Sequence, residues 1–288
     1  MIQTIRKAWG VPELRKKILF TLMILVIYRL GSAIPVPYVN VQLLSDYLDS
    51  MGTTILGLYN VMSGGAFAQA TVFALGIQPY INSSIIIQLL TVAIPALERM
   101  QREGGEEGKK KIQSITRYST VAIAFLQALG YFFILKRGFN GMSMLTSDTI
   151  WAALVIMVSW VAGSSFLMWL GEQCNEFGVG NGISMILFAG IISRVPSMIT
   201  GMYNGLVAGT MPWWLILLAV IGILALVVLI VFVNDAERRI PVQYAKRQVG
   251  RKMYGGQTSN LPMKVNMSGV LPIIFAQSIA TIPATIGA

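Results

Sequence analysis

Residues 215–233 read LILLAVIGILALVVLIVFV, a run without a charged or strongly polar side chain. The hydrocarbon core of a bilayer is about 30 Å thick, and about 20 helical residues are needed to cross it. Backbone groups in lipid must find hydrogen-bond partners within their own segment, which a helix provides. Strands of a membrane β-barrel would instead alternate apolar and polar residues. The run therefore predicts a membrane-spanning helix.

Other stretches meet the same requirements of length and polarity, so we expect an all-α, polytopic membrane bundle. Together with the first run, the expected spans lie at residues 18–34, 71–95, 118–135, 150–170, 183–199, 212–233 and 269–288. The composition agrees, because 12% of the residues are charged, where soluble domains average about 25%. The mean hydropathy of +0.67 is also typical of a membrane protein.

The distribution of Lys and Arg predicts the orientation of these spans. Loops that carry an excess of Lys and Arg stay in the cytoplasm. One set of loops holds nearly all of the basic residues: Arg6, Lys7, Arg15, Lys16, Lys17, Arg99, Arg102, Lys109, Lys110, Lys111, Arg117, Arg238, Arg239, Lys246, Arg247, Arg251, Lys252 and Lys264. The opposite loops hold only Lys136, Arg137 and Arg194. We therefore expect a multi-pass protein of a cytoplasmic membrane, with its N-terminus in the cytoplasm.

The cytoplasmic loop at residues 234–264 is too long for a simple turn. It mixes basic residues with Gln243, Tyr244, Gln248 and Tyr254. The net charge of +10 is first of all a signal of membrane topology. A second interpretation of this loop is a docking surface for an acidic partner, such as ribosomal RNA or an acidic protein patch.

Residues 55–65 are too few to cross a membrane, and they end in Ser63, Gly64 and Gly65. No charged residue lies between Asp49 and Glu98, so this segment can insert from the outer side. We expect a half-helix followed by a flexible break. Irregular backbone at membrane depth needs surrounding protein or a water-filled cavity. A re-entrant segment therefore predicts a cavity.

The second expected span is unusually polar, which predicts that it faces other helices or water rather than lipid. Its polar side chains are Gln78, Asn82, Ser83, Ser84 and Gln88. Pro79 is expected to bend this helix, because proline lacks an amide donor and clashes with the carbonyl of Leu75. Ile77 and Ile81 stand four residues apart and would share one face near the middle of the bilayer. Ordinary core packing is the alternative for this pair.

The sequence contains no motif typical of an enzyme or of a phosphate-binding site. The chain has no His and one Cys, Cys174, so neither a metal site nor a nucleophile paired with histidine is expected. Residues 104–111 (GGEEGKKK) lack the glycine spacing of a phosphate-binding loop, and residues 178–182 (GVGNG) are interpreted as a flexible cytoplasmic turn. We expect neither an enzymatic activity nor a cofactor.

A secondary transporter for a small solute remains the alternative function. Such proteins usually need charged residues within the membrane, and the expected spans carry no Asp, Glu, His or Lys.

Several segments resemble the SecY family, whose members form the centre of the bacterial protein-conducting channel. The resemblance runs through residues 31–37 (GSAIPVP), 62–67 (MSGGAF), 73–91 (FALGIQPYINSSIIIQLLT), 166–173 (FLMWLGEQ), 178–191 (GVGNGISMILFAGI), 238–257 and 261–275. These segments occur in family order along the whole chain. The resemblance implies a passive channel that passes unfolded polypeptides across the membrane and releases membrane segments sideways into lipid.

The resemblance also implies roles for particular residues. A ring of bulky aliphatic side chains narrows the family's pore, and the matching positions are Ile77, Ile81, Leu187 and Ile274. A plug at about residues 53–65 would include Ile55, Leu56, Leu58, Tyr59, Val61 and Met62. A lateral gate between the second and third spans and the seventh and eighth would carry Gln88, Gln127 and Gln277. Docking of a ribosome or the SecA motor would use Arg238, Arg239, Lys246, Arg247, Arg251 and Lys252.

The expected partners are the SecE and SecG subunits, the SecA motor, the ribosome, a translocating polypeptide with its signal sequence, and the lipid bilayer. Family members have ten spans, so the resemblance implies that these seven are the first two-thirds of a SecY. Residues 1–205 would then form the first half with the plug, within one membrane domain. Residues 206–288 would begin the second half, with its cytoplasmic loop at 234–264.

Overall fold

The structure, a computed structural model, describes residues 10–51, 57, 60, 63–138, 142–210, 212–242, 247–249, 252–254, 259–264, 266 and 276. The chain forms two compact units. One comprises Met1–Ser197 with Gln277–Ala288, and the other comprises Met198–Ala276.

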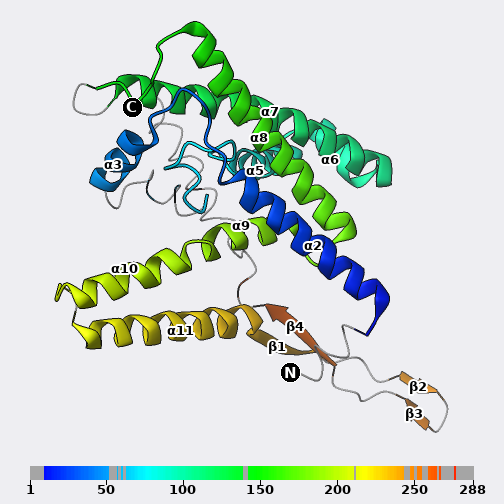
Figure 1. Ribbon diagram of the computed structural model, residues 1–288. Helices are drawn as coiled ribbons and strands as arrows, with labels where there is room; N and C mark the ends of the chain where they lie inside the picture. Colours follow the sequence, from blue (N-terminus) through cyan, green and yellow to red (C-terminus); the bar gives the residue numbers. More distant parts are fainter. Residues whose placement is uncertain are drawn as a thin grey trace. The chain divides into compact units, whose positions relative to one another are not determined.

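The first unit is a helical bundle (Figure 1). Its helices are α2 (Pro12–Gly31), α3 (Val41–Met51), α5 (Gln78–Ala93), α6 (Pro95–Arg102), α7 (Gly105–Arg137), α8 (Ile150–Phe177), α9 (Gly182–Ile192) and the start of α10 (Val195–Val207). The long helix α7 packs against α5, α6 and α8, and α2 packs against α8 and α9. Helices α7 and α8 therefore form the centre to which the other helices attach.

Local sequence sets where several of these helices begin and end. Pro12 stands in the first turn of α2, where the missing amide donor costs nothing because first-turn amides lack helical partners. The side chain of Asn181 caps α9 by accepting bonds from the amides of Ile183 and Ser184. Helix α7 ends at Gly138, whose φ of +74° is a left-handed conformation that glycine adopts without strain.

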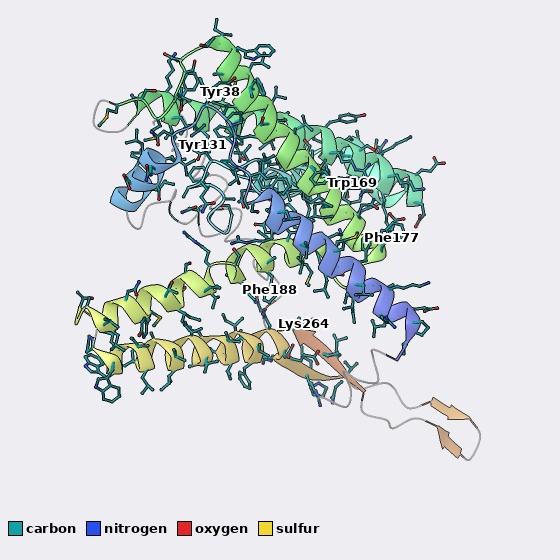
Figure 2. All side chains as sticks on the ribbon, viewed as in Figure 1. Tyr38, Tyr131, Trp169, Phe177, Phe188 and Lys264 are labelled. Atoms are coloured by element: carbon teal, nitrogen blue, oxygen red, sulfur yellow. The ribbon has the colours of Figure 1, made fainter. Side chains whose placement is uncertain are left out.

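The core of this unit is centred on a column of three aromatic rings. Tyr131 of α7, labelled in Figure 2, stacks on Phe67 at 4.2 Å and on Trp160 of α8 at 4.4 Å between ring centroids. Leu44 and Leu48 of α3 belong to the same buried cluster. Full burial of an aromatic or aliphatic side chain of this size contributes about 1.5–3 kcal/mol.

Residues 63–77 form hydrogen-bonded turns rather than helix, so the second expected span, at 71–95, is wrong in its first part. Helix α5 begins at Gln78, with Pro79 in its first turn. At that position proline starts a helix without breaking a bond, and the expected bend at Leu75 is therefore wrong. The bend lies instead between α5 and α6, which meet at 100° next to Pro95.

The second unit contains most of α10, the apolar helix α11 (Trp213–Asp235), and two antiparallel strand pairs. Strand β1 (Glu237–Val242) pairs with β4 (Ser259–Lys264), and β2 (Arg247–Val249) pairs with β3 (Lys252–Tyr254). These strands were not predicted from the sequence. None of the apolar window of α11 is buried inside the structure, which suits a helix surrounded by lipid.

Four helical stretches among the described residues are long and apolar enough to cross a membrane, and up to five if α5 and α6 form one broken span. The four are Gly105–Arg137, Ile150–Phe177, Gly182–Val207 and Trp213–Asp235. They match the third to sixth expected spans, and α2 matches the first. The seventh, at residues 269–288, lies outside the described residues. The chain is thus a helical, multi-pass membrane protein, as predicted.

Candidate functional site

Ile77 and Ile81 mark the point where the irregular segment becomes helix. Ile77 is the residue before α5, and the amide of Ile81 donates to its carbonyl at 3.2 Å. Both side chains are buried, at 3% and 8% exposed. The Ile77 side chain lies against Gly171 of α8, where an added Cβ would stand 3.4 Å from Ile77 Cδ1. This distance is an ordinary van der Waals contact, so Ile77 packs directly on α8 at Gly171.

Helix α9 brings further aliphatic side chains to the same place. Ile183 Cγ1 and Ile186 Cδ1 also lie within 3.4 and 3.7 Å of a Cβ built at Gly171. Ile186 is buried, and the next residue, Leu187, is half-buried. Ile183 and Ile186 were not predicted as site residues, although their spacing of three residues on an apolar helix gives them one common face.

Other predicted residues lie outside the described part of the chain. These are Ile274 of the ring, Gln277 of the gate, Lys246 and Arg251 of the docking loop, and all six named plug residues: Ile55, Leu56, Leu58, Tyr59, Val61 and Met62. Asn60, within the expected plug segment, is described and is buried.

The two described glutamines expected at a gate differ in their surroundings. Gln88 of α5 is exposed, whereas Gln127 of α7 is half-buried. The Gln127 Oε1 atom is fully buried and has no hydrogen-bond partner among the described residues. An unpartnered buried amide oxygen in a membrane helix is unfavourable by about 1–3 kcal/mol, so this atom is available to another polar group.

The polar residues of α5 serve in part to attach it to α7. Ser83 Oγ donates to the carbonyl of Thr116 at 2.9 Å, and both residues are buried. Gln78 and Asn82 bond each other along α5, at 3.4 Å. The polarity of this helix, expected to face helices or water, is thus partly used within the α5–α7 pair.

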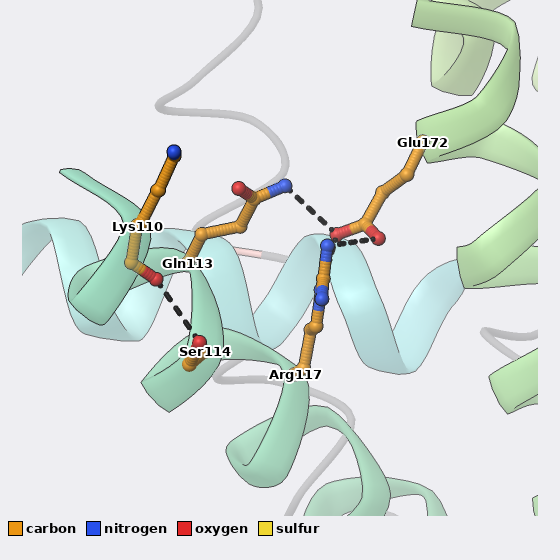
Figure 3. A network of polar contacts seen from close by, with 5 residues as sticks. All are labelled: Lys110, Gln113, Ser114, Arg117 and Glu172. Atoms are coloured by element: carbon orange, nitrogen blue, oxygen red, sulfur yellow. Dashed lines mark hydrogen bonds and ion pairs between the residues drawn. The ribbon is translucent and has the colours of Figure 1, made fainter. Parts of the chain in front are cut away.

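A carboxylate joins α7 to α8 (Figure 3). Glu172 Oε1 accepts bonds from Arg117 Nε at 3.0 Å and from Gln113 Nε2 at 3.2 Å. Arg117 Nη2 also pairs with Glu172 Oε2 at 2.9 Å, which makes the contact bidentate. The carboxylate is committed to these donors, and no group of three or more His, Cys, Asp or Glu suited to a metal ion exists among the residues described.

The turn between α8 and α9 is held by side chains and is not the flexible turn expected at residues 178–182. The amide of Val179 donates to Thr21 Oγ1 of α2 at 3.0 Å. The amide of Gly182 donates to Asn175 Oδ1 at 2.7 Å. A Cβ at Gly182 would lie 2.3 Å from the carbonyl oxygen of Gly171, so the close approach of α9 to α8 requires glycine here.

The four docking residues that the structure describes belong to the strand pairs of the second unit. Arg238 and Arg239 are exposed on β1, opposite Met263 and Pro262 of β4. Consecutive residues of a strand point to opposite faces, so these two guanidinium groups point to opposite sides of the ribbon. Arg247 lies in β2 and Lys252 in β3.

Comparison with known proteins identifies relatives of the chain. The family model for SecY matches residues 71–288. A protein translocase subunit SecY from Aquifex aeolicus (strain VF5) is 42% identical over 288 residues, which cover 99% of this chain and 67% of that relative. The SecY of Escherichia coli (strain K12) is 44% identical over 279 residues, which cover 96% of this chain and 62% of that protein. The chain thus spans about two-thirds of the length of these relatives.

Solved structures share the fold. A protein-conducting channel matches with a TM-score of 0.64 at 19% identity, over 98% of this chain and 62% of its own. Sec61 in the canine ribosome–channel complex matches with a TM-score of 0.61 at 19% identity, over 98% of this chain and 63% of its own. With the sequence identities to the curated relatives, these findings establish that the chain belongs to the SecY family.

Proposed function

We propose that the chain forms the central, pore-forming part of a protein-conducting channel. In this role it passes unfolded polypeptides across the cytoplasmic membrane and releases apolar segments sideways into lipid. Membership of the SecY family supports the role. The observation that carries it is the aliphatic cluster at the start of α5, where Ile77, Ile183 and Ile186 meet over Gly171.

The constriction of the pore would be formed by Ile77, Ile81, Leu187 and Ile274. A ring of aliphatic side chains excludes water by dewetting and deforms around a passing chain. Because such a ring offers no charge or hydrogen bond, it does not select a particular sequence. This property suits a conduit for many different polypeptides.

The remaining site assignments are part of the same proposal. Residues 53–65 would act as the plug, and Gln88, Gln127 and Gln277 would line the lateral gate. The buried, unpartnered Oε1 of Gln127 supports a polar contact with another helix. Residues 1–205 would form the first half of the channel, and residues 206–288 would begin the second.

The proposed partners are SecE, SecG, the SecA motor, the ribosome, and a translocating polypeptide with its signal sequence. Cytoplasmic partners would dock on the ribbon of β1 and β4, where Arg238 and Arg239 are exposed. This requires a cytoplasmic N-terminus, as the distribution of Lys and Arg predicts.

The rival function is a secondary transporter for a small solute. Ion-coupled transporters generally use charged groups buried within the membrane. Among the described residues, no Asp, Glu, Lys or Arg is buried. This composition favours a passive conduit, and we expect no chemical reaction at the site.

The test replaces the ring residues by Ser in the complete channel and measures ion conductance in planar bilayers. Ile77→Ser with Ile81→Ser is expected to raise the leak of the closed channel at least several-fold, because hydroxyls stabilise water in the constriction. Ile86→Ser with Leu89→Ser is the matched control, since these residues lie on the same helix but are 38% and 48% exposed. An equal leak in both variants would reject the ring.

A further inference from the structure

The segment between Asn60 and α5 is attached to two helices through its backbone carbonyls. Tyr28 of α2 donates its hydroxyl to the carbonyl of Ser63 at 3.3 Å. Tyr131 of α7 donates its hydroxyl to the carbonyl of Phe67 at 2.6 Å. Both tyrosines are buried, at 4% and 3% exposed. Two separate helices thus hold carbonyls that lie four residues apart.

Within the segment, side chains replace helical hydrogen bonds. Asn60 Oδ1 accepts from the amide of Ala68 at 3.0 Å, and its carbonyl accepts from the amide of Gly65 at 2.9 Å. Ser63 Oγ donates to the carbonyl of Asn60 at 3.1 Å and accepts from the amide of Phe67 at 3.2 Å. These bonds close the turn on itself, which leaves little freedom for rotation.

The two glycines of this turn have different surroundings. Both adopt left-handed φ, at +68° for Gly64 and +89° for Gly65. A Cβ added at Gly64 would lie 2.7 Å from the carbonyl oxygen of Gly190 on α9, which is closer than real Cβ contacts. A Cβ added at Gly65 would meet nothing closer than Arg194 Nε at 3.8 Å. Gly64 is therefore packed against a third helix, whereas Gly65 has room.

From the turn the chain continues to the candidate ring through further backbone bonds. The amide of Thr71 donates to the carbonyl of Ala66 at 3.1 Å, and the amide of Gly76 donates to the carbonyl of Phe73 at 2.9 Å. Phe73 in turn packs on Gly31 of α2, where a Cβ would fall 2.0 Å from its ring. The segment that leads to α5 is thus attached to α2, α7 and α9, and Gly76, with a φ of +58° and open space around it, lies between this attached part and Ile77.

We propose that Asn60 and residues 63–67 act as a fixed anchor and not as a flexible hinge, and that Tyr28, Tyr131 and Gly64 position the start of α5. The anchor holds Ile77 where the constriction closes. A hinge needs backbone that can rotate without losing bonds, whereas rotation at Gly64 breaks its packing on Gly190. The inference rests on the proposed function, because the closure of a pore is what the anchor would serve.

The first experiment removes the two hydroxyls and keeps the rings. Tyr28→Phe and Tyr131→Phe, made singly and together in the complete channel, are expected to raise closed-channel ion leak. One lost hydrogen bond shifts the balance between a seated and a displaced segment by about fivefold. The double variant should show roughly the product of the single effects, because the tyrosines lie on different helices.

Tyr118→Phe is the matched control, since Tyr118 lies on α7 with Tyr131 but is 78% exposed. It should leave the leak unchanged. The midpoint of thermal unfolding is measured in parallel, with all leak recorded well below it. A lower midpoint with a wild-type leak would assign the tyrosines a merely structural role and overturn the inference.

The second experiment compares the neighbouring glycines. Gly64→Ala should raise the leak strongly, because it adds a clash with α9 to the strain of positive φ. Gly65→Ala should have a small effect, because only the strain applies. A hinge would respond about equally to both, since either alanine restricts the same rotation. Rapid hydrogen exchange at the Gly65 amide would equally contradict a fixed anchor.

The two proposals fail in distinguishable ways. If the serine variants of Ile77 and Ile81 do not leak, the pore assignment itself is wrong. If they leak while the tyrosine and Gly64 variants remain closed, the ring stands and only the anchor is rejected.

Discussion

The carboxylate of Glu172 is the most enclosed charged group in the contact between α7 and α8. Its side chain is 9% exposed, whereas that of its partner Arg117 is 48% exposed. Removing Arg117 leaves the enclosed carboxylate without its compensating charge, whereas removing the charge of Glu172 leaves a guanidinium that water can solvate. The two residues should therefore respond differently to substitution.

We predict that Arg117→Ala destabilises the protein by about 2 kcal/mol, because it leaves the enclosed carboxylate with Gln113 as its one remaining side-chain donor among the described residues. Glu172→Gln should be unfavourable by less than about 1 kcal/mol, since its amide oxygen still accepts from Arg117. The midpoint of thermal unfolding in detergent, followed by tryptophan fluorescence, measures both. A larger loss in Glu172→Gln would contradict this account of the contact.

Single residues could be predicted from the sequence where the signal is local. The apolar character of Ile77 and Ile81 predicted that they avoid water, and both side chains are buried, whereas their place in a ring stays a prediction. The Arg117–Glu172 contact joins residues 55 positions apart and depends on how two antiparallel helices are aligned. Nothing in the neighbourhood of either residue specifies that alignment, so the pair could not be predicted.

At the scale of elements, the sequence predicted long apolar helices well and short or irregular elements poorly. Helix α11 is apolar throughout and needed no tertiary information. The turns at residues 63–77 depend on hydroxyls from Tyr28 and Tyr131, which are distant in sequence. Strand β1 contains Pro241, and strand β4 contains Pro262. Proline argues against a central strand, but it is compatible with a two-stranded ribbon because both strands of a ribbon are edge strands.

The ribbon leads to a prediction about docking. Arg238 and Arg239 point to opposite faces, so a partner with a flat surface can contact only one of them. We expect one of the variants Arg238→Glu and Arg239→Glu to weaken the binding of ribosomes or SecA about tenfold, and the other to change it little. Sedimentation or surface binding at two salt concentrations measures the effect.

Thr210→Glu is the control for this prediction, because it adds negative charge at an exposed turn between α10 and α11. It should not alter binding. Equal losses in both arginine variants would indicate a partner that surrounds the ribbon. Affinity that is insensitive to both charge reversals and to salt would remove the docking role.

At the scale of the whole molecule, the distribution of charge is the property that both units share. Basic residues gather in the segments at residues 99–117 of the first unit and 238–264 of the second. Each unit thus carries its own signal for orientation in the membrane. If the positive-inside rule acts on both, the basic loops of the two units lie on the same side of the bilayer.

Cysteine labelling of intact cells tests this orientation, with one site on each expected side of each unit. In a Cys174→Ser background, cysteines at Met142 and Thr210 should react with a membrane-impermeant maleimide. Cysteines at Lys110 and Arg239 should react only after the membrane is permeabilised. All four positions are exposed in the structure, whereas native Cys174 is 1% exposed, so differences in labelling report membrane sidedness rather than burial. Labelling of Arg239→Cys in intact cells would place the basic ribbon outside, and neither cytoplasmic docking nor the proposed topology could then hold.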